Sequence, residues 1–160
     1  MGFTEVTDKE QLLGLAERIK QDFPQSCLMY NNLLLRARGF CSTRRFFIIE
    51  DSLDSYVILN QSNDQHSYFI PYCREYEVDQ LMKALEETSL VNWRGDLLFG
   101  DIQTFLVNPI QALAQKMGVS LTEDRYYRFT YHPHLDTESL RIKPATHSVW
   151  VAHFNAAENY

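Results

Sequence analysis

Few side chains in this sequence have the types and spacing that could form a catalytic or metal site. His132, His134 and Asp136 alternate along one short segment, and all three residue types can bind a metal ion. Alternate residues in a Pro-containing loop supply too few ligands, because a structural zinc site needs four ligands in tetrahedral geometry. His147 and His153 stand alone in the sequence, and we interpret them as packed or surface residues.

The short motifs that mark the main enzyme classes are also missing. The sequence contains no Gly-x-Ser-x-Gly elbow, no His-Glu-x-x-His and no Gly-x-x-x-x-Gly-Lys loop. Cys27, Cys41 and Cys73 are widely spaced, so we expect three free thiols in a reducing compartment. The sequence therefore predicts no catalytic residue, no cofactor-binding residue and no metal ligand, and it leaves open whether the chain is an enzyme.

Glycine usage argues against a phosphate-binding loop. A pyrophosphate usually approaches closely spaced glycines before a helix N-terminus, but none of the six glycines forms a Gly-x-Gly. Gln11, Gly14 and Ala16 do match the Gln/Arg-x-x-Gly-x-Gly/Ala signature of GNAT acetyltransferases. They fall inside a predicted helix, whose backbone N–H groups are already used, so we interpret the match as chance.

Charge and composition limit the partners of the chain. Its 160 residues, 45% of them hydrophobic, suit a single domain. A net charge of −6 argues against nucleic acid, whose phosphates require clustered Lys and Arg. Two basic pairs, Arg36 with Arg38 and Arg44 with Arg45, could each bind an anion, although a solvated flank is the favoured interpretation.

Membrane and export signals are likewise missing from the sequence. No apolar run approaches the roughly 20 residues that cross a bilayer. The first ten residues lack both a signal peptide and an Arg-rich presequence. We therefore expect a soluble, cytoplasmic protein that contacts no membrane.

The hydrophobic pattern predicts helices and strands in a mixed order. Thr7 and Glu10 form a capping box, and apolar residues follow at helical spacing as far as Phe23, where Pro24 ends the helix. Residues 27–38 form either a second helix, which we favour, or an irregular strand. Three β-branched and aromatic runs predict an antiparallel meander, at residues 46–49, 55–59 and 67–70.

A second α/β stretch follows the meander. Helix 77–87 and a short strand at 97–99 come first. Asn108 and Pro109 then predict the start of a helix that ends at Gly118, and residues 119–121 and 126–131 form a final strand. This order predicts an α/β (α+β) fold, with a mixed central sheet and helices on both faces.

The element order resembles the GNAT acyltransferase fold, and local sequence narrows the resemblance to the glycine N-acyltransferase family. Residues 89–94, 108–114 and 119–121 are similar to the N-terminal half of these proteins, and residues 23–30 are similar to the segment after their first helix. The most specific motif is Asn92-Trp93. Trp93 could stack on a ligand, but an anchor in the core is the favoured interpretation.

This resemblance implies a domain division. Family members join an N-terminal, degenerate GNAT-like half to a C-terminal half that binds acyl-CoA and acylates an amino-acid amine. We expect residues 1–135 to form the N-terminal GNAT-like domain. Residues 136–160 would be the linker and the start of a missing or truncated second GNAT domain. The resemblance also admits a mitochondrial location, although the sequence shows no presequence.

The resemblance also locates the turn at which a GNAT fold holds the CoA pyrophosphate. It follows the third strand of the meander, here residues 71–77. The turn contains no glycine, and Glu75 and Glu77 place negative charge where a helix N-terminus would attract an anion. Arg74 is its one basic residue. We predict that this chain binds no acyl-CoA, the co-substrate of the family.

These observations lead to one expected function with two alternatives. We expect an accessory domain of an acyl-CoA:amino-acid (glycine-type) N-acyltransferase that is not catalytic alone and partners a catalytic GNAT domain in cis or in trans. One alternative is a divergent but complete acyl-CoA-dependent N-acyltransferase. The other is a stand-alone interaction module that pairs with a full-length relative.

Overall fold

The computed structural model describes residues 2–23, 25–49, 56–61, 66–122, 124–126 and 149–154. Its helices and strands follow a βααβββαβαββ order, with three short 3-10 turns between them. In chain order they are β1 (Phe3–Val6), α1 (Lys9–Ile19), η1 (Lys20–Asp22), α2 (Cys27–Ala37), β2 (Arg44–Ile49), β3 (Tyr56–Gln61), β4 (His66–Tyr72), η2 (Glu75–Glu77), α3 (Val78–Glu87), β5 (Asp96–Ile102), η3 (Thr104–Leu106), α4 (Val107–Lys116), β6 (Asp124–Tyr126) and β7 (Val149–Phe154).

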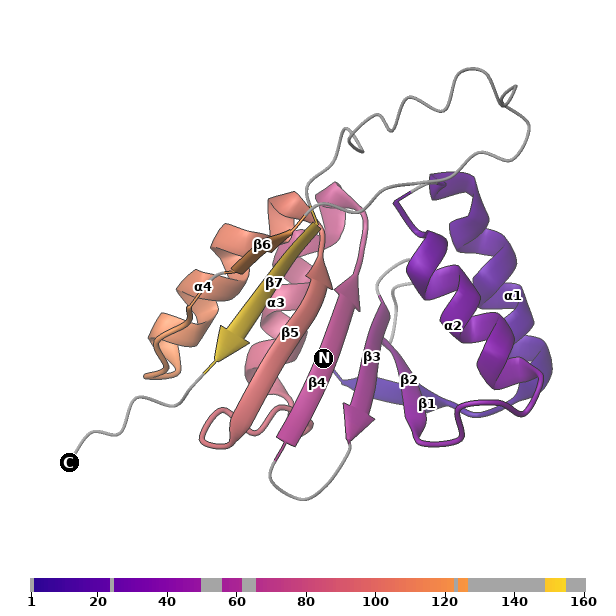
Figure 1. Ribbon diagram of the computed structural model, residues 1–160, viewed down its shortest axis with the longest axis horizontal. Helices are drawn as coiled ribbons and strands as arrows, with labels where there is room; N and C mark the ends of the chain where they lie inside the picture. The colour runs from indigo at the N-terminus through magenta and orange to yellow at the C-terminus, as the bar shows by residue number, and fades with distance from the viewer. Residues whose placement is uncertain are drawn as a thin grey trace.

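The strands form one seven-stranded sheet in the order β1-β2-β3-β4-β5-β7-β6 (Figure 1). β1 to β4 are antiparallel, which confirms the predicted meander. β4 and β5 run parallel, whereas β5, β7 and β6 are again antiparallel. A parallel pair needs a crossover connection, and α3 supplies it.

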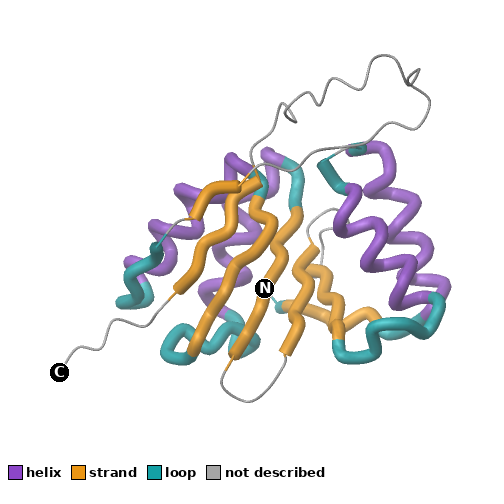
Figure 2. The backbone as a smooth tube through the Cα atoms, in the orientation of Figure 1, coloured by secondary structure: helices purple, strands orange, loops and turns teal. Residues whose placement is uncertain are grey.

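Helices cover both faces of the sheet (Figure 2). Neighbouring residues of β2 point to opposite sides, so Phe46 packs with α1 and α2 and Phe47 packs with α3 and α4. Each helix contributes an apolar stripe, as α1 does with Leu12, Leu15 and Ile19. Burying one such Leu or Ile side chain contributes about 1.5–3 kcal/mol. The predicted mixed sheet with helices on both faces is confirmed.

Two predicted helix starts are wrong in detail. α1 is capped by Asp8, whose carboxylate accepts the Gln11 N–H at 2.9 Å, and Thr7 is not the cap. Both residue types are good caps, so the sequence pattern could not separate neighbouring positions. α4 begins at Val107, one residue before the predicted cap, Asn108. Pro109 lies in the first turn, where helix N–H groups have no intrahelical acceptor.

The end of α4 is as predicted. Gly118 adopts a φ of 78°, and the Val119 N–H bonds back to the Ala114 carbonyl at 2.9 Å. This is the left-handed helix stop that glycine allows. The strand predicted at 119–121 is wrong, because the next strand begins at Asp124. The first helix, predicted to continue to Phe23, ends at Ile19 and is followed by the 3-10 turn Lys20–Asp22. The remainder of the predicted 126–131 strand and Pro24 lie outside the described residues.

Strand β1 was not predicted from the sequence. Its four residues pair with β2, from Phe3 opposite Ile49 to Val6 opposite Phe46. The Arg45 guanidinium donates two bonds to the Glu5 carboxylate, at 2.6 and 3.0 Å, and holds the pKa of Glu5 below its usual range. Both side chains are about one third exposed, so the pair contributes less than about 1 kcal/mol.

Strand β7 lies in the segment that we predicted to lead into a second domain. It occupies the sheet position between β5 and β6, with Leu97 opposite Phe154 and Arg125 opposite Trp150. Residues 149–154 therefore belong to the same sheet as β1, and the sequence pattern could not show this because their partners are distant in the chain. A division near residue 135 stays a prediction.

The register of β5 is interrupted between Phe99 and Ile102, where Asp101 adopts a φ of 52°. Gly100 lies in this irregular segment, and the ring of Tyr68 on the neighbouring strand packs directly over it. A Cβ atom at position 100 would overlap the Tyr68 ring. The Tyr68 hydroxyl approaches the Asp101 carboxylate, at 3.4 Å.

We predict opposite effects for alanine at two glycines. Gly100→Ala should lower the free energy of unfolding by about 1–3 kcal/mol, because the new methyl group displaces the Tyr68 ring. Gly14→Ala is the matched control, since Gly14 is exposed in the middle of α1 with open space around it. Gly14→Ala should raise the free energy of unfolding by about 0.5–1 kcal/mol. Denaturant unfolding of both variants measures the difference, and a neutral Gly100→Ala would contradict the packing argument.

Candidate functional site

The parallel strands β4 and β5 end at the same edge of the sheet. Their pairing runs from His66 opposite Asp96 to Phe69 opposite Phe99, and a loop and a helix follow each strand. In open α/β sheets, ligands bind beside the carboxyl ends of such strands. The loops after β4 and β5 are therefore the candidate functional site.

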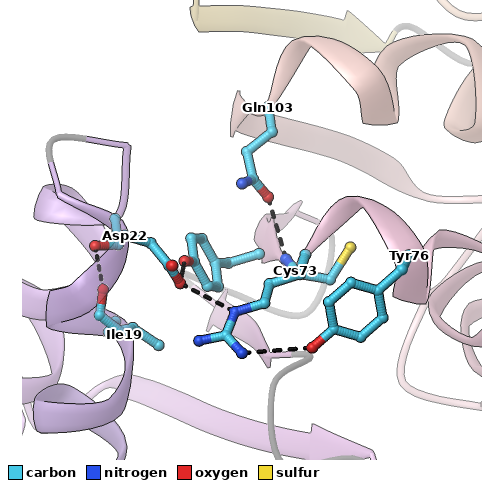
Figure 3. Close-up of polar contacts among 8 residues, drawn as sticks. Ile19, Asp22, Cys73, Tyr76 and Gln103 are labelled. Atoms are coloured by element: carbon cyan, nitrogen blue, oxygen red, sulfur yellow. Dashed lines mark hydrogen bonds and ion pairs between the residues drawn. The ribbon is translucent and has the colours of Figure 1, made fainter.

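A side chain bridges these two loops. The backbone N–H of Cys73, directly after β4, donates to the Gln103 carboxamide oxygen at 3.1 Å (Figure 3). Gln103 comes directly after β5. An N–H group at the end of a strand could otherwise bind a ligand carbonyl or phosphate oxygen. Here the Gln103 side chain accepts the bond from the Cys73 N–H and so connects the two loops.

The turn that follows Cys73 is a compact 3-10 turn. The Glu77 N–H bonds to the Arg74 carbonyl at 2.9 Å, so the turn uses this amide internally. Glu75 is exposed, whereas the Glu77 side chain is buried, and both precede α3. Two carboxylates at this position interact favourably with the α3 dipole and repel a phosphate group.

Two side chains at the end of β4, Tyr72 and Arg74, meet at Asp22. The Tyr72 hydroxyl donates to Asp22 Oδ2 at 2.5 Å, and the Arg74 Nε lies 3.4 Å from the same oxygen (Figure 3). Arg74 also donates to the Tyr76 hydroxyl, at 3.4 Å. Burial, together with the bond to Asp22, raises the pKa of Tyr72 far above its usual range. The network therefore links the end of α1 to the turn before α3.

Cys73 is unsuited to nucleophilic catalysis. Its side chain is fully buried, and burial together with the nearby Glu77 carboxylate raises the pKa of the thiol to about 12. A thiol must ionise to act as a nucleophile, so almost none of it is reactive near pH 7. Cys41 is exposed and Cys27 is half-buried.

The structure separates the other residues that the sequence had singled out. Gln11 and Gly14 lie within α1, as expected of a chance match to the acetyltransferase signature. Trp93 is a core residue whose ring centroid lies 6.0 Å from that of Phe99, which confirms the interpretation of Trp93 as an anchor in the core. Of the basic residues, Arg45 binds Glu5, as described above.

The structure does not test the interpretation that the histidines and Asp136 form no metal site. His132, His134, Asp136 and His147 lie outside the described residues, and His153 belongs to β7. Within the part of the chain that the structure describes, no group of three His, Cys, Asp or Glu side chains could hold a metal ion.

Sequence reasoning missed Asp22, Tyr72 and Gln103. Asp22 and Tyr72 are 50 residues apart, and Cys73 and Gln103 are 30 residues apart. No local motif signals such contacts. The parallel pairing of β4 and β5 is the one inference that would have placed Gln103 beside Cys73.

Comparison with known proteins shows the fold but not the family. No family model and no curated protein matches the sequence. A Drosophila protein solved by X-ray crystallography superposes with a TM-score of 0.59 at 15% sequence identity. The match covers 82% of this chain and 55% of the Drosophila chain, so this chain spans just over half the length of that neighbour. At this identity the likeness concerns the fold alone.

Among the described residues, no helix combines the length and apolar character needed to cross a membrane.

We predict that the three cysteines react in the order of their exposure. Iodoacetamide should modify Cys41 first and Cys27 more slowly, whereas Cys73 should react only after unfolding, because it is buried and un-ionised. Peptide mass spectrometry at pH 7.5, with and without denaturant, measures this order. Cys41→Ser should remove the fast phase, and rapid native labelling of Cys73 would contradict the described packing.

A second prediction concerns alkaline pH. The pKa of Tyr72 is raised in the folded chain, so its protonated form contributes stability that is complete below the unfolded pKa of about 10 and is lost as the pH rises above it. Tyr72→Phe should therefore destabilise the chain at pH 8 but lose less stability between pH 9 and 11 than the wild type. Denaturant unfolding at each pH tests this. Tyr30→Phe is the control and should keep the wild-type slope, and an unchanged slope in Tyr72→Phe would contradict the prediction.

Proposed function

We propose that this chain is an accessory GNAT-like domain of an acyl-CoA:amino-acid (glycine-type) N-acyltransferase and is not catalytic alone. The observation that carries the proposal is the closed turn after β4. The Cys73 N–H donates to Gln103, and the Glu77 N–H donates to the Arg74 carbonyl within the turn. The turn contains no glycine, and Glu75 and Glu77 precede α3. A CoA pyrophosphate would therefore meet occupied amides and two carboxylates.

The sheet supports the same proposal. Its mixed order, with one parallel pair and helices on both faces, agrees with the GNAT-like fold to which the sequence bears a resemblance. The resemblance to the N-terminal half of glycine N-acyltransferases, centred on Asn92-Trp93, supplies the reaction class. The Drosophila neighbour has a similar fold within a chain of which this one spans just over half.

Acyl-CoA binding and turnover test the proposal. The purified chain should show no saturable rise in melting temperature with acetyl-CoA or benzoyl-CoA. A ligand at about 100 times its Kd would add about 2.7 kcal/mol of stability, which a melting experiment detects easily. Mass spectrometry should find no N-acylglycine above the buffer control, and a full-length glycine N-acyltransferase run alongside verifies the assay.

The alternatives predict different outcomes of the same experiments. Saturable acyl-CoA binding together with acylglycine formation would replace the proposal with a divergent but complete acyltransferase. A chain that is inert alone but stimulates a separately expressed catalytic half would support the accessory role directly. Complex formation with a full-length relative and no change in its turnover would favour the interaction module.

A further inference from the structure

The end of β4 presents two hydrogen-bond donors to one oxygen atom. Tyr72 and Arg74 are two residues apart on extended backbone, so their side chains leave the same side of the chain. That side faces α1 and α2, because Tyr72 belongs to the core that these helices cover. The Tyr72 hydroxyl and the Arg74 Nε both reach Asp22 Oδ2. A neutral hydroxyl and a guanidinium that converge on one oxygen are well suited to binding an oxyanion.

The Tyr72 hydroxyl is a dependable donor in this arrangement. Tyr72 is only 4% exposed and stacks on Tyr56, with ring centroids 6.2 Å apart, so its ring is fixed in place. Because its pKa is raised, the hydroxyl keeps its proton throughout the neutral range. The position of the Tyr72 ring, and with it the position of its hydroxyl, is thus set by packing at the end of β4 and not by Asp22.

Asp22 comes from a short 3-10 turn, η1, in which no residue is buried. It is the last residue of η1, and the backbone around it makes turn bonds from Phe23 N–H to Lys20 and from Ser26 N–H to Asp22, at 3.3 and 3.2 Å. The Arg74 and Asp22 side chains are 32% and 29% exposed. An ion pair this accessible is weak, so an external anion can compete with Asp22 for Arg74. The Tyr72 hydroxyl bond, at 2.5 Å, is the stronger contact that the anion must also replace.

We propose that Tyr72 and Arg74 form an oxyanion-binding site for a carboxylate or a phosphate group, and that its resident occupant is the chain's own Asp22. An external anion displaces the Asp22 carboxylate and releases η1 from the end of β4. The site lies on the α1 side of the strand and uses side chains, whereas the pyrophosphate turn would use backbone amides. Tyr72 and Arg74 nevertheless belong to the turn at residues 71–77, so the two proposals share residues. They are tested separately, because small anions probe these side chains whereas acyl-CoA probes the backbone amides.

Asp22→Ala tests the site by removing its occupant. The variant should gain a saturable rise in melting temperature with sodium acetate or sodium phosphate, beyond the rise with sodium chloride at equal ionic strength. Because Asp22 occupies both donors, removing it should lower the midpoint concentration at least about fivefold relative to wild type. The preferred anion tells whether the site suits a carboxylate or a phosphate group.

Two controls make the result specific. Arg74→Gln in the Asp22→Ala background should abolish the response, because it removes the positive donor. Glu17→Ala removes an exposed carboxylate of α1 and should behave like the wild type. If Asp22→Ala and the Asp22→Ala/Arg74→Gln double variant show equal rises in melting temperature with acetate or phosphate, the proposal is wrong.

Asp22→Asn is a second variant for the case in which Asp22→Ala does not fold. It keeps the shape of the side chain but leaves Arg74 without this negative partner, so a response to acetate or phosphate should still appear. If neither variant responds to either anion beyond the chloride control, Asp22 is a structural ion pair and the proposal is wrong.

Discussion

The parallel pairing of β4 with β5 is the constraint on which the rest of this structure depends. Two parallel neighbours cannot be joined by a tight turn, so the chain must cross one face of the sheet, and α3 fills that crossing. The same pairing brings the ends of both strands to one edge. Cys73 and Gln103 meet there only because each residue directly follows one of the two strands. The hydrogen bond between the loops is thus a consequence of sheet topology.

The sequence predicted the parts of the fold that local periodicity determines. The apolar spacing of α1 and α3, the β-branched and aromatic runs of β2 and β3 and the left-handed stop at Gly118 all carry local signals. β1 has four residues and no distinctive pattern, so only its pairing with β2 makes it a strand. The site was harder to predict. The absence of glycine and the two acidic residues after β4 were visible in the sequence, but the partners Asp22 and Gln103 depend on tertiary structure.

A common feature connects the polar contacts at the end of β4. Groups that could bind a ligand are satisfied by the chain itself, a backbone amide by Gln103 and a hydroxyl and guanidinium by Asp22. Such contacts avoid the cost of burying an unpaired polar group, about 1–3 kcal/mol each. They also differ in strength. The bond from the Cys73 N–H belongs to a buried residue and joins the ends of two paired strands. The contact between Arg74 and Asp22 is partly exposed and depends on a short 3-10 turn.

The position of β7 has a consequence for the order in which the protein folds. β5 and β6 are separated in the sheet by β7, which follows both of them in sequence, so the sheet stays incomplete until residues 149–154 have been synthesised. Until then the outer edge of β5 presents unpaired backbone groups to other chains. Contacts between segments this distant along the chain also slow folding. Loss of residues 149–154 would therefore leave this edge of β5 open to aggregation.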